Sequence, residues 1–227
     1  MKKCIQIAID GPSGAGKSTV ARLIAQKLGI LYVDTGALYR AVGLYALRAG
    51  ASTRDETAVK ALLPRVDVEL QHRDGQQRVL LNGEDVSDEI RAHPVSAAAS
   101  EVSALPAVRA FLLALQQKIA ATHSVVMDGR DIGTVILPRA DVKIFLTASP
   151  EARARRRYLE LAAKDAAVTP EQVLADLMVR DHNDSTRAAA PLKQAEDAIL
   201  VDTSRMDLEE SVETILSLIE DRLKDVL

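Results

Sequence analysis

The segment 11–18 reads G-P-S-G-A-G-K-S and follows the pattern G-x4-G-K-[ST]. It lies between the β-rich run 5–10 and the segment 18–28, whose apolar residues recur at helical spacing. Glycines in such a loop let backbone N–H groups converge on a polyphosphate, and the start of the next helix adds partial positive charge. A glycine-rich turn without a ligand is the alternative, but it gives no reason for a lysine there. The segment therefore predicts a strand, a phosphate-binding loop and a helix.

Within this loop two side chains have distinct expected roles. Lys17 can reach the β- and γ-phosphate oxygens of a nucleoside triphosphate, and Ser18 is placed to bind Mg²⁺. The residues expected to bind the nucleotide are Gly11, Pro12, Ser13, Gly14, Ala15, Gly16, Lys17, Ser18 and Thr19.

Strand and helix signals alternate along the rest of the chain. Further strands are expected at 31–33, 124–128, 141–147 and 198–202, and helices at 36–48, 106–121 and 151–163 and after residues 169 and 207. The strands at 124–128 and 141–147 are nearly continuous apolar runs, as buried parallel strands are. The pattern predicts an α/β protein of the P-loop NTPase fold, with a five-stranded parallel sheet flanked by helices.

One segment departs from this alternation. Residues 66–86 read as an antiparallel hairpin or meander, with turns expected at Asp74-Gly75 and Asn82-Gly83. The expected organisation is a single domain with a core of residues 1–63 and 96–227 and a small β-containing insert at about 64–95.

Composition excludes several classes of partner. Lys and Arg number 29 against 32 Asp and Glu, and a net charge of −3 provides no polycation field for nucleic acid or an acidic membrane. The single cysteine, Cys4, cannot form an internal disulfide, which fits a reducing compartment. No apolar run approaches the roughly 18 residues of a membrane span. We expect a soluble, cytoplasmic protein and, because no long exposed apolar stripe is evident, a monomer.

Arg40 is a candidate anion-binding residue. It ends the run D-T-G-A-L-Y-R at 34–40, which follows the second strand and so emerges at the same sheet edge as the phosphate loop. A cation near the start of a helix is unfavourable for the helix dipole, and an anionic ligand would give a reason for it. The alternative is a solvated surface arginine.

A second candidate run, D-G-R-D-I-G-T, occupies 128–134 after another buried strand. The guanidinium of Arg130 suits bidentate phosphate binding, and Asp128 resembles a carboxylate near Mg²⁺ or its water ligands. The alternative is a salt-bridged Asp/Arg turn.

The helix at 151–163 carries four arginines within residues 153–157. Their mutual repulsion is tolerable if triphosphate charge arrives between them when a short lid closes. The alternative is a solvated helix face. Further on, the run 180–187 ends a helix and could face the same cleft.

Together these motifs resemble bacterial cytidylate kinase, a short-lid member of the nucleoside monophosphate kinases. The resemblance runs from Ile5 to the C-terminal helix. It rests on I-D-G-P-S-G-A-G-K at 9–17, D-T-G-A-L-Y-R at 34–40, D-G-R-D-I-G-T at 128–134 and R-D-H-N-D-S-T-R-A-A-A-P-L at 180–192. It implies phosphoryl transfer from ATP, with Mg²⁺, to CMP or dCMP, with 64–95 as the monophosphate-binding insert and about 151–168 as the lid.

The resemblance also implies residue roles. Arg40 and Arg130 would hold the acceptor phosphate, Thr35, Asp184 and Arg187 would lie about the sugar, and Ser100, Arg109 and Asp131 would read the base. Arg153, Arg157 and Arg180 would contact the triphosphate side, and Lys17, Arg130 and Arg180 would be catalytic. Two positions depart from relatives: Thr35 stands where serine also occurs, and Asn183 where some carry another arginine.

Two other functions fit parts of the sequence. A kinase of the same architecture could act on AMP, UMP or a non-nucleotide such as shikimate. A nucleotide-dependent binding or switch protein without transfer activity would share the phosphate loop, although the guanine-binding N-K-x-D sequence is absent.

Overall fold

A computed structural model describes residues 4–73, 76–163 and 168–224 of the 227-residue chain. The contacts divide it into two units, Met1–Leu31 with Ser124–Leu227, and Tyr32–His123. The expected insert at 64–95 lies within the second unit. The turn predicted at Asp74-Gly75 and part of the expected lid, residues 164–167, lie outside the described residues.

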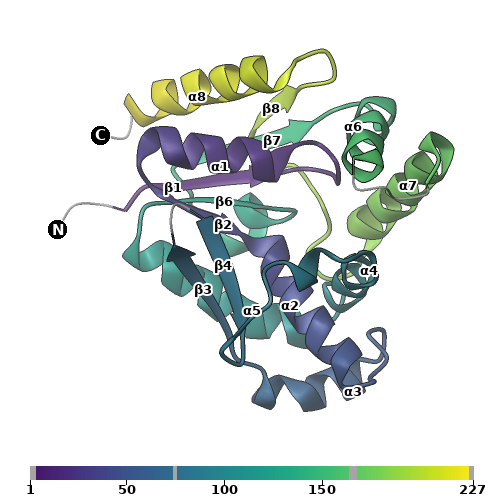
Figure 1. The fold of residues 1–227 in the computed structure, drawn as a ribbon. Helices are drawn as coiled ribbons and strands as arrows, with labels where there is room; N and C mark the ends of the chain where they lie inside the picture. The colour runs from purple at the N-terminus through teal and green to yellow at the C-terminus, as the bar shows by residue number, and fades with distance from the viewer. Residues whose placement is uncertain (1–3, 74–75, 164–167, 225–227) are drawn as a thin grey trace. The chain divides into compact units, whose positions relative to one another are not determined.

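A five-stranded parallel sheet of order β2-β6-β1-β7-β8 confirms the predicted fold class (Figure 1). Its strands are β1 (Gln6–Asp10), β2 (Leu31–Asp34), β6 (Val125–Gly129), β7 (Val142–Thr147) and β8 (Ile199–Asp202). Asp10, the last residue of β1, pairs with Gly129 on β6 and with Phe145 on β7. The carboxyl ends of the central strands therefore meet at one edge, from which the phosphate loop and the segment after β6 emerge.

Helices α1 (Lys17–Leu28) and α8 (Leu208–Lys224) pack against each other in the first unit (Figure 1). In α8, Val212, Ile215 and Ile219 are buried at helical spacing. Its start carries the reciprocal bonds of a capping box, because the backbone N–H groups of Asp207 and Glu210 each donate to the other's carboxylate at 2.9 Å.

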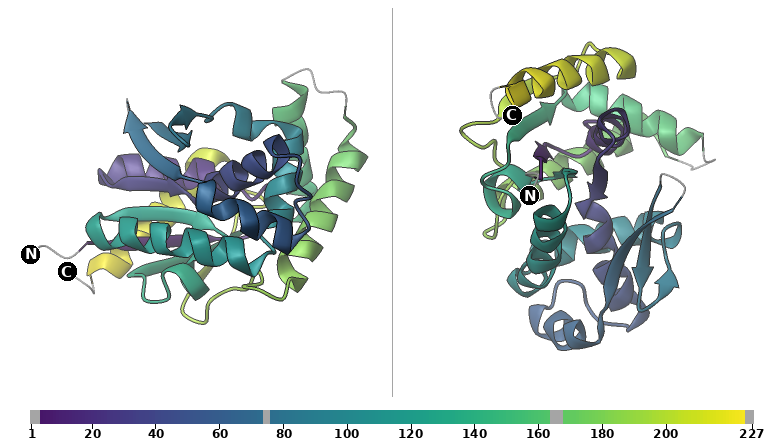
Figure 2. Two further views of the ribbon diagram at one scale, coloured as in Figure 1. Left: turned by 90° about the horizontal axis from the view of Figure 1, so that it is seen from below. Right: turned by 90° about the vertical axis from the view of Figure 1, so that its left-hand side faces the viewer.

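Helices α6 (Pro150–Ala162) and α7 (Pro170–Thr186) lie side by side (Figures 1 and 2). Both begin with a side-chain cap and a proline in the first turn. Ser149 accepts the N–H of Ala152, and Thr169 forms a capping box with Gln172. Ala154, Val173 and Leu177 form their shared apolar contact.

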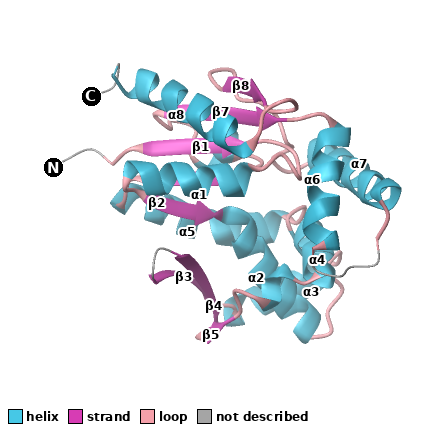
Figure 3. Ribbon diagram, turned by 45° about the horizontal axis from the view of Figure 1, so that its top comes forward, coloured by secondary structure: helices cyan, strands magenta, loops and turns pink. Residues whose placement is uncertain are grey.

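The second unit is mainly helical and carries the small antiparallel sheet β3-β4-β5 (Figure 3). Its elements are α2 (Thr35–Arg48), α3 (Glu56–Leu62), β3 (Val68–Arg73), β4 (Gln76–Leu81), β5 (Glu84–Asp85), α4 (His93–Val102) and α5 (Pro106–Thr122). Apolar side chains of α2, α4, α5 and the small sheet share one core, which includes Leu38, Val79, Val102 and Leu112.

The elements not predicted from the sequence are α3, α4, two short 3-10 helices at Leu63–Arg65 and Glu89–Arg91, and a π-helical turn at Ile132–Ile136. Within the described residues, no single helix combines the length and apolar composition of a membrane span, and only the bent pair Pro94–Val102 and Pro106–Thr122 passes that test together.

Candidate functional site

The phosphate loop ends in α1 with Gly16 in the left-handed backbone region at the N-cap. Lys17 is buried, and its ammonium donates to the carbonyl of Pro12 at 2.7 Å, so the lysine lies across the loop that precedes it. The hydroxyl of Ser18 donates to the Oδ2 atom of Asp128 at the end of β6, at 2.8 Å. The serine of the loop and the carboxylate of the neighbouring strand are thus side by side.

Lys17 lies among charges of both signs. Burial lowers the pKa of Lys17 well below its usual value, and the positive charge of Arg130 lowers it further. Asp128 and Asp184 act in the opposite direction, and Arg180 adds a second repulsive cation. The first unit therefore brings together the predicted catalytic residues Lys17, Arg130 and Arg180.

Arg130, Asp184, Arg187 and Asp131 form a chain of alternating charges. Arg130 Nε donates to Asp184 Oδ2 at 2.7 Å. Arg187 approaches Asp131 at 3.4 Å and Asp184 at 3.9 Å. These contacts join the segment after β6 to the C-terminal end of α7. The motifs at 128–134 and 180–192 are therefore in contact.

This pairing keeps the partners charged. Burial alone would lower the pKa of Arg130, but the charge and hydrogen bond of Asp184, together with the charges of two further aspartates, raise that pKa above its usual value. Burial would likewise raise the pKa of Asp184, but the charge and hydrogen bond of Arg130, together with the charges of two further arginines, hold it below its usual value. The Arg130 guanidinium and the Asp184 carboxylate therefore both stay ionised.

Arg153 is buried and its guanidinium is held by three groups of the first unit. Nε donates to the carbonyl of Ala148 and one terminal nitrogen to the carbonyl of Ser13, both at 2.9 Å. The same nitrogen lies 2.7 Å from Asp181 of α7. Arg153 thus joins the phosphate loop, α6 and α7, a structural role in addition to the predicted one on the triphosphate side.

Replacing Arg153 with methionine should lower the free energy of unfolding without nucleotide by about 3 kcal/mol, because it removes a buried cation and leaves the partly buried Asp181 without its partner. In a double-mutant cycle with Asp181→Asn the two costs should be non-additive by about 1 kcal/mol or more. Urea denaturation measures both. Arg157→Met is the matched control, since the Arg157 side chain is 41% exposed and, among the residues that the structure describes, pairs only with Glu160 of its own helix. Equal costs for Arg153→Met and Arg157→Met would contradict the structural role.

The other lid arginines differ in their surroundings. Arg156 donates to the carbonyl of Thr203 at 2.5 Å and to that of Met206 at 3.3 Å. Arg157 pairs with Glu160 at 3.0 Å, and Arg155 is exposed. Contacts within the protein therefore reduce the repulsion that the sequence suggested for residues 153–157.

Asp10 is a buried carboxylate at the end of β1 that the motif analysis did not assign. Burial raises the pKa of Asp10 from 3.8 to about 6, although the N–H groups of Ile132 and Gly133 donate to it. Between pH 3.8 and about pH 6, Asp10 is therefore mostly protonated in the folded protein and mostly ionised in the unfolded chain.

The titration of Asp10 should make stability depend on pH. Because its folded-state pKa is the higher one, its contribution is complete below about pH 4 and is lost as the pH rises through 6. The difference in free energy of unfolding between the wild type and Asp10→Asn should fall by up to about 3 kcal/mol from pH 4 to pH 7. Urea denaturation across that range tests this, and a difference that rises with pH would contradict it.

In the second unit, Arg40 lies over the start of its own helix. Asp34 caps α2 by accepting the N–H of Ala37 at 2.9 Å, and its other oxygen lies 3.4 Å from the Arg40 guanidinium. A Cβ at Gly36 would stand 3.3 Å from that guanidinium, so glycine leaves room for it. Asp34 thus offsets the unfavourable position of Arg40 and fixes its side chain at the helix N-terminus, beside the buried Thr35.

Ser100 and Arg109 lie on either side of the α4–α5 junction and meet through Ser103. The Ser103 hydroxyl donates to the carbonyl of Ser100 at 2.8 Å, and Arg109 donates to the carbonyl of Ser103 at 3.2 Å. The Arg109 guanidinium also lies over the ring of Tyr39, 5.7 Å from its centroid. The structure therefore places two of the predicted base-reading residues, Ser100 and Arg109, close together, and Tyr39 lies beside Arg109.

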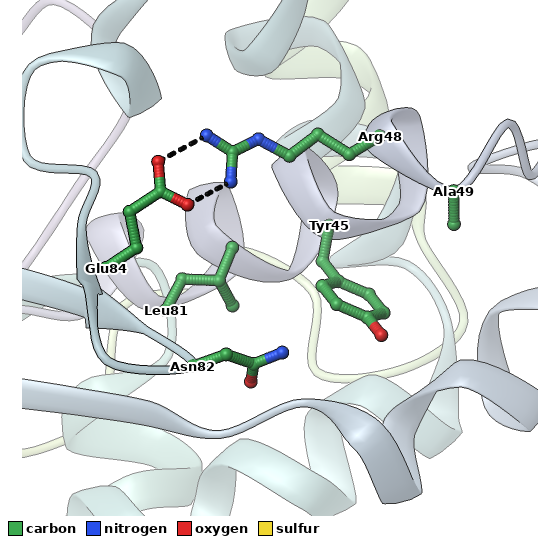
Figure 4. Close-up of a pocket in the computed structure, with 6 residues that line it drawn as sticks. All are labelled: Tyr45, Arg48, Ala49, Leu81, Asn82 and Glu84. Carbon is green, nitrogen blue, oxygen red and sulfur yellow. Dashed lines mark hydrogen bonds and ion pairs between the residues drawn. The ribbon is translucent and has the colours of Figure 1, made fainter.

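A surface pocket in the second unit contains none of the predicted site residues (Figure 4). It is lined by Tyr45, Arg48, Ala49, Leu81, Asn82 and Glu84. Arg48 forms a fork with Glu84 at 2.7 and 2.9 Å and also pairs with Glu89. These ion pairs connect the end of α2 to the small sheet, which is a structural role.

Comparison with known proteins identifies the family of the chain. The family model described as cytidylate kinase matches residues 7–221. The chain is 52% identical to a cytidylate kinase of Carboxydothermus hydrogenoformans, with 98% of this chain and 100% of that protein covered. It is 51% identical to a cytidylate kinase of Pseudomonas aeruginosa, with 92% and 93% covered. The fold is similar to a gluconokinase from Sinorhizobium meliloti at TM-score 0.52 and 16% identity, with 100% and 97% covered.

Proposed function

Since the chain belongs to the cytidylate kinase family and is a kinase, we propose that it transfers the γ-phosphoryl group of ATP to the phosphate of CMP or dCMP. The observation that carries the proposal is that the charge of Arg130, after β6, acts on Lys17 in the phosphate loop, where Asp128 and Asp184 act in the opposite direction. A donor and an acceptor phosphate both need such cations.

On the donor side, the loop from Gly11 to Thr19 would bind the triphosphate through backbone N–H groups, with Lys17 on its terminal oxygens. Arg153, Arg157 and Arg180 would add charge from α6 and α7. Residues 151–168 would form the lid, and closing it would exclude water and suppress hydrolysis of ATP.

The Ser18 hydroxyl and the Asp128 carboxylate, 2.8 Å apart, fit Mg²⁺, which prefers oxygen ligands. Among the described residues no group of three or more His, Cys, Asp or Glu could hold a metal. Ser18 would therefore be the direct protein ligand and phosphate oxygens would supply others, as is usual for Mg²⁺. When bound, the ion neutralises phosphate charge.

On the acceptor side, Arg40 and Arg130 would hold the phosphate of CMP, within a monophosphate-binding region that includes residues 64–95. Thr35, Asp184 and Arg187 would bind the sugar. In the charge chain, Arg130 and Arg187 already have carboxylate partners, so their guanidinium groups need little further ordering before substrate binds.

Ser100, Arg109 and Asp131 would read the base. Cytosine offers an amino donor where uracil offers a carbonyl acceptor, so a carboxylate at Asp131 accepts from cytosine and repels uracil. Arg109, stacked on Tyr39, would donate to the ring nitrogen or the carbonyl of cytosine.

The chemistry needs no general base, because the acceptor phosphate already presents an anionic oxygen near neutral pH. The work of the protein is to bring two polyanions into line against their repulsion, which amounts to several kcal/mol in a water-poor site. Lys17 and the arginines offset that repulsion, and they do so most strongly where charge develops on the transferred group.

An assay of CMP, dCMP, UMP and AMP side by side, with ATP and Mg²⁺, tests the proposal. CMP and dCMP should be converted to diphosphates with the highest kcat/KM. A preference for AMP or UMP would assign another acceptor. Slow release of ADP with no phosphorylated product would indicate a nucleotide-dependent switch instead.

We also propose that the enzyme is a cytoplasmic monomer that binds neither nucleic acid nor membrane. The near balance of 29 basic and 32 acidic residues supports this. Sedimentation equilibrium at micromolar concentration should give the mass of a single chain, 24.5 kDa.

A further inference from the structure

Asp10 joins the phosphate loop to the segment that carries Arg130 and Asp131. It is the last residue of the central strand β1, immediately before Gly11, and it is only 4% exposed. Its Oδ1 accepts the N–H of Ile132 at 2.8 Å and its Oδ2 accepts the N–H of Gly133 at 2.7 Å. Both carboxylate oxygens are thus used by two consecutive backbone groups.

These N–H groups open the π-helical turn at Ile132–Ile136. The first N–H groups of a helical turn have no partner within the turn, and Asp131, at its N-cap position, makes no side-chain cap. Asp10, at the end of β1, accepts these N–H groups instead and so caps the turn. A Cβ at Gly133 would lie 3.4 Å from Asp10 Oδ2 and 3.1 Å from the Lys143 side chain, so this close approach suits a glycine.

A carboxylate at position 10 costs free energy, but only a carboxylate offers two acceptor oxygens in this place. It is buried, and the negative charge of Asp131 adds repulsion, which Lys17 partly offsets. An asparagine of the same shape has only one acceptor oxygen, and its NH₂ group would face one of the two N–H donors. The arrangement therefore needs both oxygens.

We propose that Asp10 is a positioning residue that sets the place of Arg130 and Asp131 relative to the phosphate loop. It touches neither substrate and acts through the backbone of residues 132 and 133. The proposal rests on the proposed function for its kinetic consequence, because Arg130 and Asp131 would bind the phosphate and the base of CMP. A displacement of about 1 Å in such groups can cost about a hundredfold in rate.

The kinetic test compares Asp10→Asn with Asp141→Asn. Asp141 is the matched control, because its Oδ2 also accepts a backbone N–H from another element, that of Gln6 at 2.9 Å, but at the opposite end of β1. Asp10→Asn should lower kcat for CMP by about tenfold or more and reduce the CMP to UMP ratio of kcat/KM by about tenfold. Asp141→Asn should change both by less than about twofold. A purely structural Asp10 would leave the CMP to UMP ratio unchanged, and that result overturns the proposal.

Hydrogen exchange gives a readout that does not depend on the substrate. In Asp10→Asn the amides of Ile132 and Gly133 should exchange at least about tenfold faster than in Asp141→Asn. Unchanged exchange overturns the proposal even if CMP is the substrate, whereas faster exchange in an enzyme that does not phosphorylate CMP supports it and rejects only the proposed acceptor. Asp10→Ser keeps one acceptor and replaces Asp10→Asn if that variant does not fold. Failure of both to fold would assign Asp10 to stability and overturn the proposal.

Discussion

Arg130→Ala should lower kcat for CMP at saturating ATP by about a hundredfold or more, the usual effect of losing a charge partner of the transition state. Arg130 acts on the pKa of Lys17 in the phosphate loop and donates to Asp184 on α7 at 2.7 Å, so in the proposed reaction it would serve both phosphates. Without it, the negative charges of both phosphates and of Asp184 would remain less well compensated. Steady-state kinetics with CMP and ATP each varied would measure the loss.

Two further variants make this result specific. Arg130→Lys keeps the charge but not the planar fork of donors, so its kcat should lie between those of the wild type and Arg130→Ala. Arg48→Ala removes an arginine with two carboxylate partners far along α2 from the predicted site residues, and its kcat should stay within about twofold of the wild type. A kcat for Arg130→Ala within about threefold of the wild type would reject the role of Arg130.

Local patterns predicted the elements that hold the phosphate loop. The apolar strands and the amphipathic helices of the parallel sheet lie close to their expected bounds, since burial on both faces of a strand or on one face of a helix imposes a period on the sequence. Helix α4 was not predicted because small residues dominate its sequence, H-P-V-S-A-A-A-S-E-V, and no side chain caps its start. Helix α3 is short, although Asp55 caps it by accepting the N–H of Ala58.

The connections between motifs could not be read from local patterns. The bonds of Arg153 to Ser13 and of Asp10 to Ile132 join residues that lie far apart in the sequence. The sequence spacing of either pair does not predict the contact. Both contacts depend on the strand order, in which β1 lies between β6 and β7. A signal for Asp10 did exist: it is a carboxylate in an otherwise apolar buried strand, and such a group needs partners.

The same central position of β1 leaves no room for a side chain at Gly11, the first residue of the phosphate loop. Gly11 follows Asp10 with φ of +150°, and a Cβ built there would stand 1.9 Å from the carbonyl oxygen of Leu146 on β7. A backbone carbonyl in a parallel sheet has no flexible end that could move aside. The loop or the strand would therefore have to shift by about 1 Å to restore an ordinary contact.

Gly11→Ala should accordingly lower the free energy of unfolding by about 3 kcal/mol or more, and it should raise the KM for ATP at least about tenfold because the shift moves the phosphate loop. Gly29→Ala is the matched control. Gly29 also has a positive φ, +64°, at the end of α1, but its Cβ would meet nothing within 4 Å, so it should lose only about 1 kcal/mol from backbone strain. Urea denaturation without nucleotide compares the two. Equal losses would show that backbone conformation, and not the close approach of β7, requires glycine at position 11.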